Sequence, residues 1–179
     1  KTLNLKCPLP LPPLPMAPVK VHVYDLSQGM AAQLSPMLLG KQIGGIWHTG
    51  VCVFGKEFFY GGGIQTGVPG MTPYGRPVEV IDLGETHVPE EVCVEFLGEM
   101  SKRFTPQAYS LMSNNCNNFA DELCSLLTGQ SLPGHITGLP AEVLASPMGA
   151  MLGPIIAGME GQMKQAMAAG GGLSAAGFQ

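Results

Sequence analysis

The sequence predicts an α+β domain, and three observations support this. Residues 19–25 and 47–53 alternate between apolar and polar side chains, which is the period of half-buried strands. Between residues 113 and 130 the apolar residues recur instead at helical spacing, in SNNCNNFADELCSLLTGQ. With 179 residues, 45% of them hydrophobic, the chain can bury one substantial core. We therefore expect one domain flanked by tails.

The first 18 residues contain PLPLPPLP, which suits neither a helix nor a central strand. We predict an extended Pro-rich tail over 1–18 that serves as a linker or as an arm on a neighbour. The folded domain is expected to begin at Val19, with a strand in VKVHVYD. His22 alternates with the valines of this strand and is predicted to lie at the surface.

Three further strands are expected before the first clear helix. Residues 26–45 carry glycines between short apolar groups and predict a loop-rich connection with one or two helical turns. In the strand IWHTGVCVFG, Val51 and Val53 share one face with Trp47, whereas His48 shares the other with Gly50 and Cys52. The segments EFFYGGG and VEVIDLG predict the other two strands.

Proline and glycine delimit the expected helices. Pro89, followed by two glutamates, begins a helix in which Cys93 falls on the core side. Residues 132–144 predict a turn, with His135 in a loop, and a short helix that begins at Pro140. The last segment, 148–179, is rich in Met, Ala and Gly, and each glycine costs a helix about 1 kcal/mol relative to alanine. We expect it to be a flexible tail.

Cys116 lies among four asparagines at the start of the predicted 113–130 helix. Asparagine caps helix N-termini, and the helix dipole there favours a thiolate, which lowers the pKa of a cysteine. This placement suits a nucleophile. The alternative is a small core filler, since cysteine is among the most buried residue types. Cys124, inside the same helix, is expected to be such a buried cysteine.

Composition argues against several functions. The net charge is −4 and no basic run occurs, so nucleic acid is not an expected partner. The five cysteines and four histidines show no metal-ligand spacing, which favours free thiols in a reducing compartment with no metal and no cofactor. No apolar run is long enough to span a membrane, and residues 1–18 lack the core of a secretory signal. We expect a cytoplasmic or nuclear protein.

His48 and Cys116 together suggest thiol catalysis. A lone strand histidine is usually a polar residue on an open face, but an imidazole beside a cysteine can take its proton. Papain-like enzymes use this pair, with the cysteine helix before the histidine strand. Here the order is reversed, as in a circularly permuted chain.

Several segments resemble the PPPDE family of permuted papain-fold peptidases, and in particular the DeSI-type deSUMOylating isopeptidases. The matching segments are VYDLS (Val23–Ser27), LSPMLLGKQIGGIWHTGV (Leu34–Val51), EFFYGGGI (Glu57–Ile64), NNCNNFADELCSLLTG (Asn114–Gly129) and LPAEVL (Leu139–Leu144). The resemblance covers a peptidase domain at 19–147 and implies a circularly permuted papain-like fold. It places the catalytic dyad of the family on His48 and Cys116.

The resemblance implies hydrolysis of the isopeptide bond between a SUMO or ubiquitin C-terminal glycine and a substrate lysine. The oxyanion would be held by first-turn N–H groups, with the amides of Asn115 and Asn117 as further candidates. Trp47 and the glycines Gly61 and Gly62 are candidate walls for the modifier tail, although these glycines also suit a simple turn. Tyr60 is a candidate for orienting the imidazole, or else it packs with its hydroxyl in water.

Two other functions fit the same residues. A thiol and an imidazole can hydrolyse an acyl-cysteine thioester, and likeness of fold does not separate the two reactions. An assembly component could also keep this fold while its tails bind neighbouring proteins. The resemblance additionally implies a homodimer.

Overall fold

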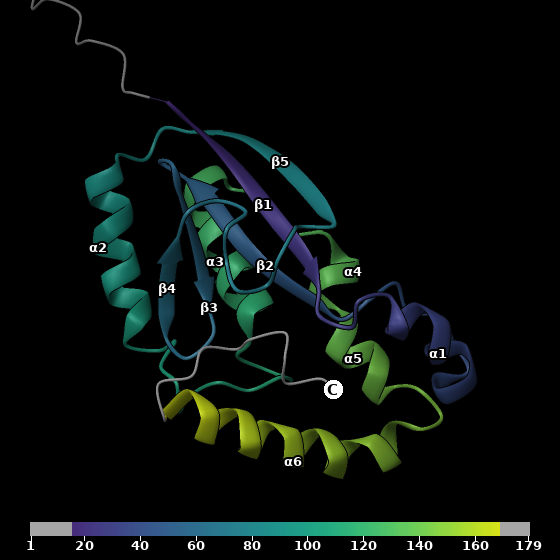
Figure 1. The fold of residues 1–179 in the computed structure, drawn as a ribbon. Helices are drawn as coiled ribbons and strands as arrows, with labels where there is room; N and C mark the ends of the chain where they lie inside the picture. Colours follow the sequence, from purple (N-terminus) through teal and green to yellow (C-terminus); the bar gives the residue numbers. More distant parts are fainter. Residues whose placement is uncertain (1–15, 169–179) are drawn as a thin grey trace, which may run out of the picture.

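The structure is a computed structural model that describes residues 16–168, so most of the Pro-rich segment and the last eleven residues lie outside it. Its centre is a five-stranded antiparallel sheet with the order β4-β3-β2-β1-β5 (Figure 1). The strands are β1 (Ala17–Asp25), β2 (Trp47–Val53), β3 (Lys56–Tyr60), β4 (Ile64–Gly67) and β5 (Glu79–Thr86). The helices are α1 (Met30–Leu39), α2 (Glu90–Ser101), α3 (Cys116–Thr128), α4 (Gly134–Thr137), α5 (Leu139–Leu144) and α6 (Gly149–Ala168). The predicted α+β class is confirmed.

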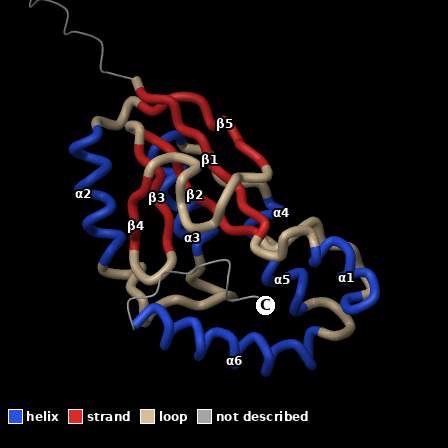
Figure 2. The backbone as a smooth tube through the Cα atoms, viewed as in Figure 1, coloured by secondary structure: helices blue, strands red, loops and turns tan. Residues whose placement is uncertain are grey.

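The two faces of the sheet are covered differently. Helix α3 lies behind the sheet, and the loop of residues 68–78 between β4 and β5 crosses its front (Figures 1 and 2). Along β2, Thr49, Val51 and Val53 face α3, because successive side chains of a strand point to opposite faces. His48, Gly50 and Cys52 therefore face the 68–78 loop, and the predicted division of this strand into two faces agrees with the structure.

The main core fills the space between the sheet and α3. Phe119, Leu123 and Cys124 of α3 are fully buried there against the valines of β1 and β2. Cys93 of α2 is also buried, so both cysteines that were predicted to be core residues have that role.

The N-terminus of α3 is capped by asparagines, as the sequence predicts. The side chain of Asn115 accepts hydrogen bonds from the N–H groups of Asn117 and Asn118, at 2.9 and 3.0 Å. The side-chain oxygen of Asn118 in turn accepts a hydrogen bond from the N–H of Asn115 at 3.0 Å, which completes a capping box. The helix ends at Gly129, whose φ of 72° suits glycine. Cys116 is thus the first residue of a well-defined helix.

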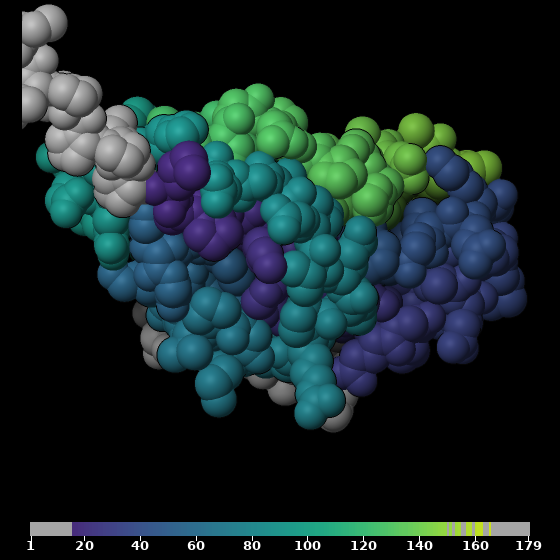
Figure 3. Space-filling model, turned by 90° about the horizontal axis from the view of Figure 1, so that it is seen from above, coloured from purple at the N-terminus to yellow at the C-terminus, as the bar shows by residue number. Residues whose placement is uncertain are grey.

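Several elements differ from expectation. Residues 30–39 form α1, a ten-residue helix with Pro36 inside it, where only a turn or two was expected. This helix projects beyond the sheet at one end of the molecule (Figures 1 and 3). The short strand β4 was not predicted, and His135 lies in α4 rather than in a loop.

The largest difference is α6, which forms where a flexible tail was expected. Glu160 of this helix accepts hydrogen bonds from the Ser110 hydroxyl, at 3.1 Å, and from the Leu111 N–H, at 2.5 Å. Tertiary contacts of this kind stabilise a helix whose own glycine-rich sequence is a poor helix former. Among the helices of residues 16–168, none is long and apolar enough to cross a membrane.

Candidate active site

The N-terminus of α3 is joined to the start of β2 through Asn117. Its amide nitrogen donates to the carbonyl of Trp47 at 3.1 Å, and its amide oxygen accepts from the Thr49 hydroxyl at 3.0 Å. The Trp47 carbonyl and the Thr49 N–H point to the same edge of β2, because alternate residues of a strand share a direction. β3 pairs with β2 only at residues 51–53, so this edge is free to receive α3. Cys116 therefore lies beside the residues that flank His48.

The Cys116 thiol is buried, with only 4% of the residue exposed. Burial raises the pKa of the thiol to about 11, although the N–H of Thr49, the hydroxyl of Tyr109 and the first-turn N–H groups each lower it. The expectation that the helix N-terminus lowers this pKa below its free value is wrong, because desolvation by burial outweighs the effect of the first-turn N–H groups. At neutral pH the thiol is protonated.

The His48 imidazole is also enclosed. Its ring stacks on Tyr74 of the 68–78 loop, with ring centroids 3.6 Å apart, and lies near the rings of Tyr24 and Phe59. Burial lowers the pKa of His48 to about 3, so the ring is neutral at neutral pH. Neither ring nitrogen has a hydrogen-bond partner among the described residues. Both ring nitrogens of the neutral imidazole are therefore free of hydrogen bonds to the described residues.

The two groups do not form a hydrogen-bonded pair in this structure. The thiol instead donates to the amide oxygen of Asn117, at 3.7 Å. The His48 side chain projects from the face of β2 that carries the 68–78 loop, whereas the sulfur lies near the Thr49 N–H at the strand edge. The structure thus brings the backbones of His48 and Cys116 together and leaves the side chains in a closed, neutral arrangement.

The asparagine side chains beside Cys116 are already engaged. Asn115 accepts from two first-turn N–H groups and donates to the Leu111 carbonyl at 2.8 Å. Asn117 holds β2. Because Asn115 occupies the N–H groups of Asn117 and Asn118, the N–H of Cys116 is the first-turn donor that the cap leaves available. Neither amide points freely at a reacting carbonyl here, in contrast to the expectation.

Tyr60 does not orient His48. Its hydroxyl donates to the Thr105 carbonyl at 2.7 Å, and its ring lies on the α3 face of the sheet against Phe104 and Tyr109. His48 projects from the opposite face, so the proposed contact is wrong for this structure.

The candidate channel residues lie at two places. Trp47 is partly buried beside His135, with ring centroids 6.3 Å apart. Gly61 and Gly62 lie in the turn between β3 and β4, where Gly62 has a φ of 89°. That backbone conformation accounts for a glycine at residue 62. A role for these three residues in holding a modifier tail stays a prediction.

Two tyrosines near the candidate pair were not identified from the sequence. Tyr109 lies in the segment that leads to α3, and its hydroxyl lowers the pKa of the Cys116 thiol. Tyr74 lies in MTPYGRP, which carries turn residues but no periodic pattern. Their positions depend on loop conformation, and no local sequence signal could have identified them.

The raised pKa of Cys116 leads to a testable pH dependence. We expect its alkylation by iodoacetamide in the resting protein to be slow at neutral pH and to rise steadily toward pH 11, because only the thiolate reacts. Below that pH the thiolate fraction grows about tenfold for each pH unit. Mass spectrometry of the peptide that contains Cys116, after timed labelling across a pH series, measures this profile. Urea-unfolded protein is the control, and its alkylation rate should rise at lower pH than that of the folded protein. A plateau near neutral pH would show instead that the resting protein holds a thiolate–imidazolium pair.

Comparison with known proteins places these residues in a recognised domain. Residues 17–157 match the family model described as the PPPDE putative peptidase domain. Desumoylating isopeptidase 1 of Homo sapiens is 48% identical over 141 residues, which is 78% of this chain and 84% of that protein. Desumoylating isopeptidase 1 of Xenopus laevis is 46% identical over 140 residues, 77% of this chain and 83% of that protein. The DeSI-like protein sdu1 of Schizosaccharomyces pombe is 31% identical over 137 residues, 72% of this chain and 67% of that protein. The matched region contains all five strands, His48 and Cys116.

Proposed function

This chain belongs to the PPPDE peptidase family, and we propose that it is a cysteine isopeptidase that removes SUMO from the lysine side chains of target proteins. Two relatives that bear the name desumoylating isopeptidase are 46% and 48% identical over more than three quarters of the chain. The observation that carries the proposal is the contact between the start of α3 and the edge of β2. Through it, Asn117 holds a helix-terminal cysteine beside the residues on either side of His48.

We also propose that the fold is a circularly permuted papain-like arrangement. The strand that carries His48 precedes the helix that carries Cys116, the reverse of the usual papain order. The helix N-terminus nevertheless meets the strand edge, and a site of this kind depends on geometry in space rather than on chain order.

In the proposed reaction His48 acts first as a base and then as an acid. The imidazole takes the proton of the Cys116 thiol, and the thiolate attacks the carbonyl carbon of the modifier's C-terminal glycine. The N–H of Cys116 donates to the resulting oxyanion. The lysine amine leaves with the proton from the imidazolium, and a thioester remains on Cys116. Water, deprotonated by His48, then hydrolyses the thioester and restores the thiol.

The reaction requires the closed arrangement to open. We propose that the modifier tail displaces the 68–78 loop, so that Tyr74 leaves the imidazole. The sulfur lies near the Thr49 N–H at the edge of β2, and the proposed reaction requires the His48 side chain to turn toward this edge. Entry of water and substrate would also reduce the desolvation that now keeps both groups neutral.

A SUMO protein with an electrophilic C-terminus tests the proposal. We expect it to form a covalent adduct with the full chain, located at Cys116 by peptide mass spectrometry. The Cys116→Ser variant should form none, and Cys124→Ser, which changes another cysteine of the same helix, should still react. An adduct with a ubiquitin probe but not with SUMO would change the proposed modifier. Labelling by an acyl-chain probe alone would favour the thioesterase, and no labelling by any probe would favour an assembly role.

A further inference from the structure

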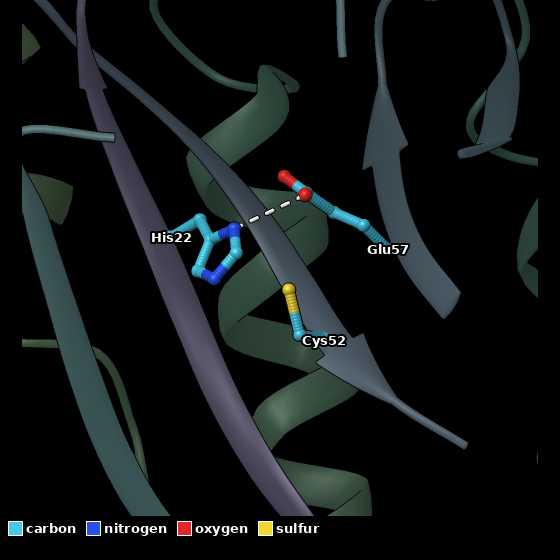
Figure 4. Close-up of side chains that lie close together, drawn as sticks. All are labelled: His22, Cys52 and Glu57. Atoms are coloured by element: carbon cyan, nitrogen blue, oxygen red, sulfur yellow. Dashed lines mark hydrogen bonds and ion pairs between the residues drawn. The ribbon is translucent and has the colours of Figure 1, made fainter. Parts of the chain in front are cut away.

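A second cluster of reactive side chains lies on the sheet face that carries the 68–78 loop, away from Cys116. Three adjacent strands each supply one residue: His22 from β1, Cys52 from β2 and Glu57 from β3 (Figure 4). The imidazole nitrogen, the sulfur and a carboxylate oxygen all lie within 4.8 Å of one another. The proposed hydrolysis uses none of these groups.

Strand register explains how the cluster forms. Cys52 is directly opposite Glu57 in the β2–β3 pair, and His22 is directly opposite Gly50 in the β1–β2 pair. A Cβ atom on Gly50 would overlap the Glu57 carboxylate. The missing side chain at residue 50 therefore gives the carboxylate room to reach across β2 toward His22.

Glu57 is a fully buried carboxylate, and its side chain has no exposed surface. One oxygen accepts from the Tyr24 hydroxyl at 2.8 Å, and the other accepts from the Gly70 N–H at 2.8 Å and lies 3.1 Å from Nδ1 of His22. An ionised carboxylate this deep needs a positive partner or several donors. Burial, followed by the nearby Glu57, raises the pKa of the Cys52 thiol to about 12, and Lys20, which is opposite Cys52 on β1, partly opposes this rise.

We propose that His22, Cys52 and Glu57 bind a zinc ion through Nδ1, Sγ and a carboxylate oxygen. Imidazole, thiolate and carboxylate are the three ligand types that zinc takes in proteins. Zinc bonds are about 2.0 to 2.3 Å long, so tetrahedral donors lie about 3.5 Å apart and these three must draw together by on the order of 1 Å. The two negative ligands balance the charge of the ion.

Binding changes the proton positions in a defined way. The Cys52 thiol releases its proton to solvent, and the imidazole proton lies on Nε2 so that the Nδ1 lone pair can face the metal. The hydrogen bond between His22 and Glu57 is replaced by coordination of both residues. The Tyr24 hydroxyl and the Gly70 N–H remain on the carboxylate and orient it, as second-sphere donors do in metal sites.

One ligand of the proposed site borders a surface hollow. Cys52 and Lys20 line a surface hollow of about 330 Å³, together with Phe54 and Pro69. Three protein ligands leave the fourth position of a tetrahedral zinc to water, and Cys52 is the ligand that borders the hollow. The bound ion would join β1, β2 and β3 and, through Gly70, hold the 68–78 loop to the sheet.

Cobalt(II) is a spectroscopic probe for this site. The host is the full chain with Cys116→Ser, purified in chelator, so that the proposed nucleophile cannot contribute a thiolate. We expect one equivalent of Co²⁺ to give a sulfur-to-cobalt charge-transfer band and tetrahedral d–d bands, and Zn²⁺ to displace both. In this host Cys52→Val should lose the charge-transfer band, and His22→Phe should bind at least about tenfold more weakly.

The matched control is Cys93→Ala in the same host, which removes a buried thiol of the main core that is not part of the cluster and should leave the spectrum unchanged. Far-UV circular dichroism in chelator shows whether each variant folds. If Cys52→Val does not fold, the weaker cobalt binding expected of His22→Phe tests the site instead. The absence of a charge-transfer band in the host, or an unchanged band in the ligand variants, would overturn the zinc site and leave the isopeptidase proposal unaffected.

Discussion

Replacing Cys116 with serine is expected to lower the rate of SUMO release from a conjugated substrate by at least about 10³-fold, since a hydroxyl in place of the thiol removes the proposed nucleophile. His48→Ala should cause a loss of similar size, because in the proposed reaction both residues act in one step and their effects do not add. The measurement is single-turnover cleavage of a SUMO-conjugated protein, with enzyme in excess, followed on gels.

Two variants serve as controls for this loss. Cys124→Ser changes a buried cysteine two turns further along α3, and Tyr60→Phe removes a hydroxyl that donates to the Thr105 carbonyl rather than to the imidazole. Both should keep turnover within a few-fold of the parent once folding is verified. Turnover that survives in Cys116→Ser, or a large loss in Tyr60→Phe, would contradict the proposed dyad.

Truncating Phe119 to alanine is expected to lower the free energy of unfolding by about 3 to 5 kcal/mol. This ring is fully buried at the centre of the core and lies against Phe104 and Tyr60, with centroids 5.4 and 6.3 Å apart. Domains are typically stable by only about 5 to 15 kcal/mol, so the variant would lose a large part of its stability. Urea denaturation followed by circular dichroism measures the change.

Phe96→Ala is the matched control, because Phe96 lies on α2 with 43% of its surface exposed. It leaves no core cavity and should change the unfolding free energy by about 0.5 kcal/mol or less. Equal losses in the two variants would mean that the core does not centre on α3.

The sequence predicts most of this fold because its periodic segments are long and distinct. The strand around Val21, the strand around Val51 and the cysteine helix each show one clear period, and each forms as expected. The four residues of β4 are too few to show a period. Helix α6 was missed because its stability comes from contacts such as those of Glu160, whereas the local glycine content argues against a helix.

Local sequence patterns predict the positions of the candidate site residues but not their protonation states. Helix capping placed Cys116 at a helix start, and strand alternation placed His48 opposite the valine face. The protonation states could not be inferred this way, because burial by distant segments such as the 68–78 loop outweighs the helix dipole. Sequence spacing also led us to expect no metal site. His22, Cys52 and Glu57 come together only through strand register, over a span of 35 residues.

The enclosure of Cys116 has a consequence for survival of the protein under oxidative stress. Peroxide converts thiolates to sulfenic acids, and it attacks exposed cysteines of low pKa first. A sulfur that stays protonated and covered between turnovers is a poor target for this attack. The resting molecule should therefore tolerate peroxide that would inactivate an open cysteine hydrolase, and under the proposed mechanism it becomes vulnerable only while substrate holds the site open.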